Sequence, residues 1–320
     1  MQAALVATLV GLGSIQVQIP STPPLALGYR AFSAASYWNS PLPLDAPVDP
    51  RSRAMVAYLE RDSAYDHIRL AGTESDGGWG EPIYWARPTD PVYNVRSTRY
   101  DLPNEFSSIR IPLGARPAAT PDRQMTIYDL LGGGVYKLWQ ARYDPGSDTW
   151  TAGGGSFYYL RSNGLHGSLK ESDEPRNDGH RGVPPAIHAV RWDEIRTGAI
   201  DHVLKVSINT PAMRHAWPMI GSDGDSLDPS APPQGARLRI KPSVDLSQLD
   251  LSPAALVLAT ALQRYGVIVG DSSGAAVSMK LENTVQEGRG ARWEGVLAAD
   301  SLKAIPFDMF EFVKTGYRRG

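Results

Sequence analysis

The sequence predicts an all-β fold, of the β-sandwich or jelly-roll type, with a few peripheral helices. Glycine and proline are abundant, at 31 and 26 of 320 residues, and this favours many turns over long helices. Short runs with alternating apolar residues recur along the chain, as expected for strands. Clear helical spacing of apolar residues occurs in residues 51–61 and 253–265.

Composition argues against several classes of protein. The net charge is -2 and no long run of one sign occurs, so the chain lacks the basic stripe expected of a nucleic-acid-binding protein. The absence of cysteine excludes disulfides, thiolate metal sites and a cysteine nucleophile. Beyond the apolar N-terminal run, no segment approaches the length of a membrane span.

Residues 1–29 form either a signal-like segment or an N-terminal arm. Their apolar run resembles the hydrophobic region of a secretory signal, but no lysine or arginine precedes Arg30. No linker interrupts residues 51–320, so we expect residues 30–320 to form a single β-rich domain.

The first half of the chain offers a possible sugar-binding segment in residues 73–87. Trp79 and Trp85 flank Glu81, and paired indoles beside a carboxylate suit the stacking of an apolar sugar face. The alternative is that both tryptophans belong to the core. Downstream, residues 125–143 predict a β-hairpin that turns at three consecutive glycines, and residues 150–152 and 156–160 predict further strands.

Residues 161–185 form a long polar loop, which is the leading candidate for a functional site. It contains Asp178, His180 and Arg181 among many other charged side chains. A loop of this length within a compact domain is more often functional or disordered than neutral, and a solvated, mobile excursion is therefore the alternative. His188 follows in a β-like run and could point into a cleft.

The next elements are a short helical turn at residues 192–196, ended by Gly198, and a strand at residues 202–209. His202 alternates with apolar residues in that strand, so we expect it to be buried and hydrogen-bonded. Asp223, Asp225 and Asp228 share one loop and could hold a structural calcium ion. The match to a calcium loop is partial, and an ordinary turn is the alternative.

The C-terminal third predicts a strand at residues 236–242, a helix at 253–265 and a strand at 267–271. Ser252 is a typical N-cap, Pro253 a first helical residue and Gly266 a stop, with Leu256 and Leu258 able to face the sheet. A crossover from this helix into the next strand would make part of the sheet parallel or mixed. A short strand is expected at residues 276–281, and a final strand or helical turn at residues 307–313.

Several segments resemble a family of large bacterial proteins that is frequent in soil actinobacteria, often exported, and often joined to carbohydrate-binding or Ig-like modules. The similarity is carried by ARYDPGSDTWTAGGGSFYYL, RWDEIRTGAIDHVLKVSINT, WPMIGSDG, PQGARLRIKPSVDL and ALQRYGVIVGDSSG. The resemblance implies an extracellular, polysaccharide-related setting and assigns no catalytic residue. A virion protein built on the same domain is the alternative setting.

These observations favour a secreted carbohydrate-active enzyme with a polysaccharide substrate and no required cofactor. A uronate lyase needs a base, an acid and a cation that neutralises the substrate carboxylate. His180 or His188 could be the base, Tyr159 the acid and Arg181 the cation. A glycoside hydrolase instead needs two carboxylates across a cleft. Candidates for that pair are Glu81, Asp178, Asp193 and Asp271.

Two other functions stay open. A non-catalytic glycan-binding or phage virion or tail surface protein would carry aromatic residues on an open face, without a convergent cluster of histidine, arginine and carboxylate. A histidine-ligated metal enzyme is less favoured, because His180 and His188 are farther apart in sequence than the usual close zinc pair. The sequence does not predict the oligomeric state.

Overall fold

The computed structural model describes residues 28–73, 78–285 and 292–318. It is strand-rich, with 26% of residues in strands and 17% in helices, and its sheets are mixed. The prediction of a β-rich chain with few helices is confirmed. The signal-like or arm segment lies outside the described residues up to position 27, as do positions 74–77 of the tryptophan segment. Among the described residues, no helix is long and apolar enough to cross a membrane.

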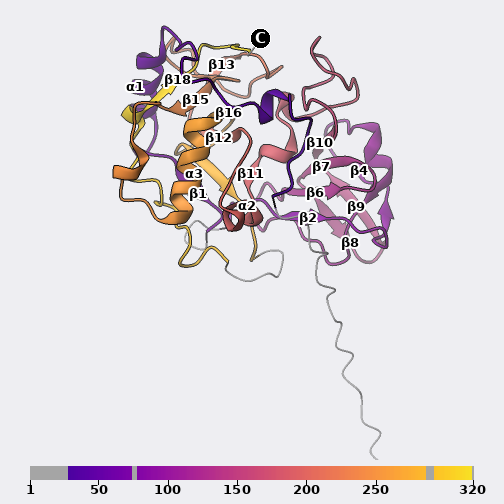
Figure 1. The fold of residues 1–320 in the computed structure, drawn as a ribbon. Helices are drawn as coiled ribbons and strands as arrows, with labels where there is room; N and C mark the ends of the chain where they lie inside the picture. Colours follow the sequence, from indigo (N-terminus) through magenta and orange to yellow (C-terminus); the bar gives the residue numbers. More distant parts are fainter. Residues whose placement is uncertain (1–27, 74–77, 286–291, 319–320) are drawn as a thin grey trace, which may run out of the picture.

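A large mixed sheet forms one half of the molecule (Figure 1). Its path runs β1 (Arg69–Ala71), β17 (Ser278–Leu281), β12 (Leu204–Ile208), β16 (Val267–Ser272), β15 (Arg237–Ile240) and β18 (Phe310–Phe312), and β11 (Ala189–Val190) also pairs with β17. Strand β12 is parallel to β16, and β1 and β11 are parallel to β17. The remaining pairs of this sheet are antiparallel.

Three α-helices lie around this sheet: α1 (Ser52–Asp62), α2 (Trp192–Thr197) and α3 (Pro253–Arg264). The predicted cap of α3 is present, because the Ser252 hydroxyl accepts the Ala255 amide at 3.2 Å. Leu258 faces the sheet as expected and is fully buried. Leu256 does not, and is 39% exposed, because two residues along a helix rotate the side chain by about 200°.

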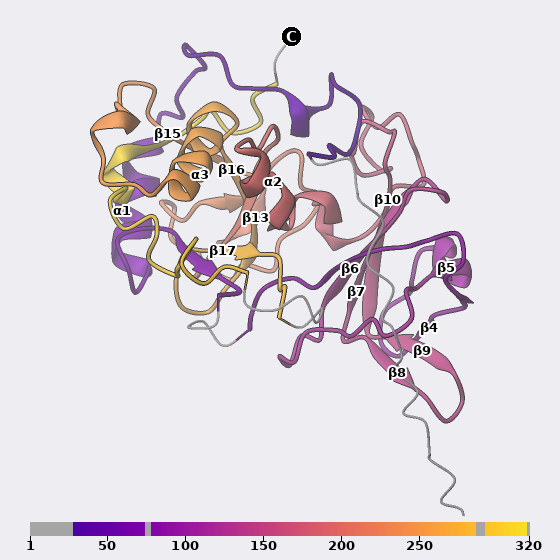
Figure 2. The same ribbon diagram turned by 60° about the horizontal axis from the view of Figure 1, so that its bottom comes forward.

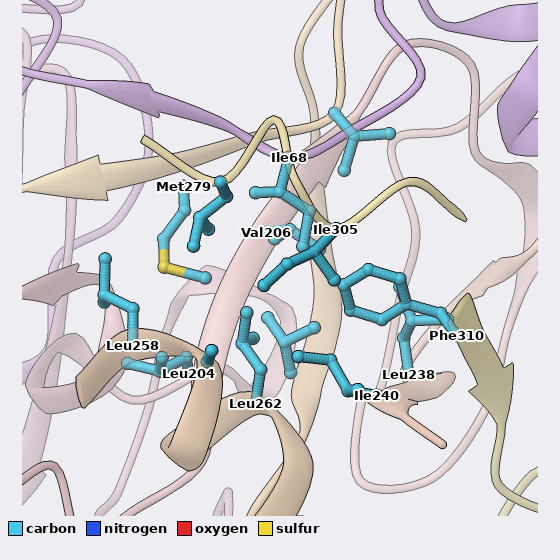
Figure 3. Close-up of a cluster of buried hydrophobic side chains, with 14 of the residues drawn as sticks. Ile68, Leu204, Val206, Leu238, Ile240, Leu258, Leu262, Met279, Ile305 and Phe310 are labelled. Carbon is cyan, nitrogen blue, oxygen red and sulfur yellow. The ribbon is translucent and has the colours of Figure 1, made fainter. Parts of the chain in front are cut away.

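The first hydrophobic core lies between α3 and the large sheet. Figure 3 shows Leu258 and Leu262 of α3 pointing towards Leu204 and Val206 of β12, with Phe310 closing one end. These side chains alternate along each strand, so the residues between them face the opposite side of the sheet. Val203 and Ile268 belong to that opposite side.

The second half of the molecule is built on a smaller sheet. Its strands, in spatial order, are β10 (Gly154–Tyr159), β7 (Gly134–Trp139), β6 (Met125–Asp129) and β2 (Ile83–Trp85). The predicted hairpin is confirmed, with β6 and β7 antiparallel and Met125 opposite Leu138. Small sheets flank these strands: β3 (Val92–Tyr93) with β5 (Ile109–Arg110), and β4 (Arg96–Ser97) with β9 (Thr149–Ala152) and β8 (Arg142–Asp144). The pair of β13 (Ala212–His215) and β14 (Pro233–Gln234) lies in the large-sheet half, where β14 contacts β16.

A second core joins the two halves. It brings Val203 and Ile268 of the large-sheet half together with Tyr128, Val135 and Tyr158 of the small sheet. A third core lies on the other face of the small sheet and includes Phe157 and Trp150. The described residues therefore stack as helix, large sheet, small sheet and a further layer of short strands.

The long polar loop is ordered in the structure and packs beside the second core. Short 3-10 helices punctuate it and the other connections, namely η1 (Tyr37–Asn39), η3 (Asn104–Ser108), η4 (His180–Gly182), η5 (Pro185–Ile187), η6 (Leu246–Gln248) and η7 (Phe307–Met309). Asn177 anchors the loop, because its buried amide donates to the Leu165 carbonyl at 2.9 Å and accepts the Tyr159 amide at 2.9 Å. Lys170, Glu171, Asp173, Pro175 and Arg176 are exposed, so the loop is anchored at its base and solvated farther out.

Candidate functional site

Charged and polar side chains interrupt the second core, between the large and the small sheet. Lys205 points there because it alternates with Leu204 and Val206, which face the first core. Lys137 of β7 points there from the small sheet and is also buried. We call the set the polar centre, and its members are Glu81, Lys137, Ser156, His180, Arg181, His188, Lys205 and Asp271.

Asp271 links the polar centre to the end of β16. Its Oδ2 accepts from Lys205 Nζ at 2.8 Å, and its Oδ1 accepts from the Arg181 guanidinium at 2.9 Å. Burial raises the pKa of Asp271, but Lys205, His180 and Arg181 together lower it far more. Asp271 is therefore a carboxylate that holds two cations in place. The sequence had suggested Asp271 as one of the two carboxylates of a hydrolase.

His180 and His188 pack ring against ring, with centroids 4.5 Å apart. His188 Nε2 lies 3.4 Å from the Val183 carbonyl, so this nitrogen carries the proton and Nδ1 is left as a free acceptor. Burial, with the neighbouring lysines, holds the pKa of both imidazoles well below the usual range, although Asp271 opposes this for His180. Both rings are therefore neutral at physiological pH.

The backbone that carries His180 is held in an unusual conformation. Four consecutive residues have positive φ, which are Gly179 at 101°, His180 at 44°, Arg181 at 55° and Gly182 at 100°. Such values cost a non-glycine residue about 1 kcal/mol or more each. Strained backbone of this kind is concentrated at functional sites, where surrounding contacts hold it in place.

Glu81 and Lys137 form a buried ion pair at the deep end of the polar centre. Lys137 Nζ lies 2.7 and 2.8 Å from the two carboxylate oxygens, and Thr126 donates a further bond at 2.7 Å. Burial lowers the pKa of Lys137 to about 8, aided by Lys280 and Lys205 and opposed by Glu81. Burial alone would raise the pKa of Glu81, but the lysines outweigh it and leave it below its usual value.

Unpartnered polar atoms gather in this region. The described residues contain five buried side-chain atoms without a hydrogen-bond partner: Arg110 Nε, Ser156 Oγ, His180 Nε2, His188 Nδ1 and Trp217 Nε1. Ser156 lies opposite Lys137 in the β7–β10 pairing, and its Cβ would be 2.4 Å from a Cβ added to Gly179, the residue before His180. Three of the five atoms therefore belong to the polar centre. Buried polar atoms are normally paired, so this cluster indicates a place for a bound polar group.

The polar centre reaches the surface at Arg181. The Arg181 guanidinium bridges Asp271 and Asp223, at 2.9 and 3.1 Å, and its side chain is 30% exposed. Burial and the nearby Asp271 raise the pKa of Asp223. Lys205 and His188 lie deeper and are almost fully covered. His180, His188 and Asp271 line none of five surface cavities in the described part of the chain.

Three predicted catalytic residues do not join the polar centre. Asp193 pairs with Arg191 at 3.0 Å. Asp178 pairs with His166 at 3.0 Å, and its side chain is 58% exposed. The Tyr159 hydroxyl donates to Glu105 at 3.0 Å, while Arg176 lies over its ring. Tyr159 faces the third core, because its neighbour Tyr158 takes the inward position in β10.

The tryptophan segment does not form a sugar platform. Trp85 is buried and stacks on Tyr128 at a centroid distance of 4.1 Å, as the core alternative predicted. Trp79 is 41% exposed. Glu81 is fully buried against Lys137 instead of lying on the surface between the indoles.

The three aspartates proposed for calcium point to different partners. Asp223 binds Arg181, and Asp228 binds Arg61 at 2.6 Å and caps the Ser230 amide at 2.7 Å. Asp225 is exposed. No group of three acidic, histidine or cysteine side chains placed to hold a metal occurs within the described ranges. The calcium site stays a prediction without geometric support.

Sequence reasoning missed Lys137, Ser156 and Lys205. A lysine between two apolar residues of a strand could have indicated Lys205. Because strand positions two apart share a face, such a lysine points to the opposite side of the sheet from its apolar neighbours. The expectation for His202 is confirmed, since it is buried and contacts Glu194 at 2.6 Å. Comparisons of the chain with models of protein families, with curated proteins and with solved structures gave no match.

Proposed function

We propose that the chain is an extracellular carbohydrate-active enzyme that cleaves a uronate-containing polysaccharide by β-elimination. The observation that carries the proposal is the convergence of His180, His188, Arg181, Lys205 and Asp271, in which His188 Nδ1 has no hydrogen-bond partner and His180 Nε2 lies 3.5 Å from Asp271 Oδ2. Neutral imidazoles can accept a proton, and the two cations can bind a carboxylate. A glycan-binding protein without catalysis would not need such a cluster.

The reaction would proceed as follows. A base removes the proton beside the uronate carboxylate, and that electron pair forms a carbon–carbon double bond. The glycosidic C–O bond on the next carbon breaks, and its electron pair leaves with the oxygen. The leaving oxygen takes up a proton, which yields a new chain end and an unsaturated uronate. No oxidant or cofactor is required.

His180 is the proposed base, and it returns its proton to the leaving oxygen. Arg181 is the proposed partner of the substrate carboxylate, and Lys205 stabilises the negative charge that develops when the proton leaves. Asp271 and His188 are positioning residues, because Asp271 holds both cations and His188 packs on the ring of His180. Tyr159 has no role in this scheme.

Substrate binding would also open the site. Arg181 is held at the surface by Asp223 and Asp271, at 3.1 and 2.9 Å. A substrate carboxylate would compete with Asp223 for the same guanidinium. Arg181 would then turn towards the substrate and expose His180. In the structure, His180 lines none of the five cavities mentioned above.

One observation favours glycoside hydrolysis as a second candidate. Asp223 and Asp271 share Arg181, and their pKa values move in opposite directions, upwards for Asp223 and downwards for Asp271. A carboxyl group with a raised pKa beside an ionised carboxylate resembles the pairing that hydrolases use. We also propose that the fold is of the β-sandwich or jelly-roll type and that the protein is extracellular. The resemblance to the actinobacterial family is part of the same proposal.

The test is the activity of the purified protein against plant, algal and bacterial polysaccharides, with and without EDTA. Reducing ends and the ultraviolet absorbance of the new double bond are both recorded, for the protein, for His180→Gln and for the matched loop variant His166→Gln. Both signals, lost only in His180→Gln, would support the lyase. Reducing ends without absorbance would indicate the hydrolase. Binding without cleavage across the panel would favour the glycan-binding or virion alternative.

A further inference from the structure

A groove lies on the outer side of the small-sheet half, formed around β8, β9 and the segment before β6. Its volume is about 460 Å³. Figures 1 and 2 show β8 and β9 on the far side of β6 and β7 from the large sheet, so the groove is separate from the polar centre. Its lining includes Tyr93, Arg116, Arg123, Arg142, Tyr143 and Trp150. We call it the arginine groove.

Three arginines give the groove its charge. Arg116, Arg123 and Arg142 are all exposed, and none forms an ion pair with another residue that the structure describes. No carboxylate is among the lining residues. The whole chain carries a net charge of -2, so the positive charge of the groove is opposite in sign to the charge of the whole chain. Unpaired guanidinium groups around one concave surface fit a ligand with several negative charges.

Aromatic rings give the groove a rigid side. The Tyr93 and Tyr143 hydroxyls both donate to Asp148 Oδ1, at 3.1 and 2.7 Å. The Tyr143 ring lies 5.2 Å from that of Trp150, which is buried and supports it from below. The Tyr143 ring is thus fixed before a ligand arrives, although the residue is 39% exposed. A fixed ring loses little conformational entropy when a ligand binds to it.

We propose that the arginine groove binds a segment of an anionic polysaccharide. The carboxylate or sulfate groups of the polymer would contact Arg116, Arg123 and Arg142, and one apolar sugar face would lie on the Tyr143 ring. This inference concerns binding alone and goes beyond the proposed cleavage, because it rests on different residues on another face of the molecule. It gives the chain a way to hold a long polymer apart from the polar centre.

The test measures binding of the full chain to polygalacturonate, dextran sulfate and uncharged dextran by affinity electrophoresis. Arg116→Gln/Arg142→Gln is compared with Arg53→Gln/Arg196→Gln, which removes the same charge from two exposed, unpaired arginines on helices α1 and α2. We expect the groove variant to bind polygalacturonate about tenfold more weakly and the control variant to bind as the parent does. Uncharged dextran in the gel should not slow the migration of the protein.

A second pair of variants separates the ring from the charge. Tyr143→Ala removes the stacking surface and should weaken binding severalfold. Tyr143→Phe keeps the ring and loses only the bond to Asp148, so it should retain most of the affinity. Thermal unfolding of all variants establishes that they are folded.

Three results would overturn the proposal. Equal losses in the two double-arginine variants would mean that attraction to the polymer is unspecific. Absence of binding to both anionic polymers would remove the ligand class. Tighter binding of a single-stranded oligonucleotide, with the same dependence on Arg116 and Tyr143, would replace the polysaccharide by a nucleic acid. Because no arm of this test measures cleavage, its result is independent of the proposed lyase activity.

Discussion

Lys205 and Asp271 form an ion pair of 2.8 Å across two neighbouring parallel strands, and the stem of the lysine passes directly over Gly270. The register of β12 against β16 shifts at this point, so that Gly270 is the extra residue between Val269 and Asp271. A Cβ at Gly270 would lie 2.9 Å from Lys205 Cγ. The absence of a side chain at position 270 is therefore what lets the lysine reach the carboxylate.

Gly270→Ala should displace Lys205 and destabilise the chain by about 1–3 kcal/mol, because an added methyl in a closely packed site forces neighbours to move. Urea unfolding measures the change. Gly146→Ala is the control, since its Cβ would meet only the Asp144 carboxylate, at 3.4 Å. A neutral result for Gly270→Ala would mean that the lysine stem has room that the structure does not show.

Stability should fall on mild acidification because of His180 and His188. The pKa of each is below that of an unfolded histidine, so between those values the unfolded chain binds a proton that the folded chain does not. The free energy of unfolding therefore decreases as pH drops below about 6.5, by about 1.4 kcal/mol per pH unit for each histidine.

Urea titrations at several pH values measure that slope. His188→Gln removes one of the two groups and should flatten the curve between pH 6.5 and 5. His215→Gln, at an exposed histidine, is the comparison variant. Parallel curves for the protein and for His188→Gln would show that folding does not lower the pKa of His188.

Removing Lys137 should leave the Glu81 carboxylate buried in the core without its main cationic partner. Lys137→Met is expected to cost about 3–5 kcal/mol, because the remaining cation, Lys280, lies 4.0 Å from Glu81. Glu81→Gln combined with Lys137→Met should cost less than Lys137→Met alone, since no buried charge is left unpaired. Lys280→Met is the milder comparison. Additive losses in the double variant would contradict direct coupling of the pair.

Arg181→Lys tests the proposed carboxylate partner. A lysine cannot bridge two carboxylates in the planar way that a guanidinium does, so we expect the KM for a uronate polymer to rise about tenfold. The matched variant is Arg176→Lys, an exposed arginine paired with Glu174 in the same loop. Steady-state kinetics on the cleaved polysaccharide separate KM from kcat. An unchanged KM would exclude Arg181 from substrate binding.

The sequence predicted elements whose signals are local. Ser252, Pro253 and Gly266 marked the limits of α3, and three glycines marked the turn between β6 and β7. The sequence also identified His180 and Arg181 as site candidates, because they lie in a long charged loop and such a loop can be recognised locally. Asp271 was visible as a carboxylate that ends a buried strand.

The rest of the polar centre depends on contacts between distant segments. Glu81 and Lys137 are 56 positions apart, and nothing near either residue indicates the other. Tyr159 was assigned to the site because tyrosines are abundant there, but alternation along β10 turns it towards the third core. Which face of a two-sided strand meets the site is set by packing, and periodicity alone does not determine it.

The topology has a consequence for the order in which the chain folds during synthesis. Arg69 of β1 pairs with Ser278 of β17, and Val48 bridges Val313, so these early segments have no partner until the last part of the domain has been made. Strands β6, β7 and β10 instead pair within one continuous stretch, residues 125–159. The small sheet can therefore form on the nascent chain before the large sheet is complete. During that interval the early strands of the large sheet are unpaired, and chaperones would be needed most.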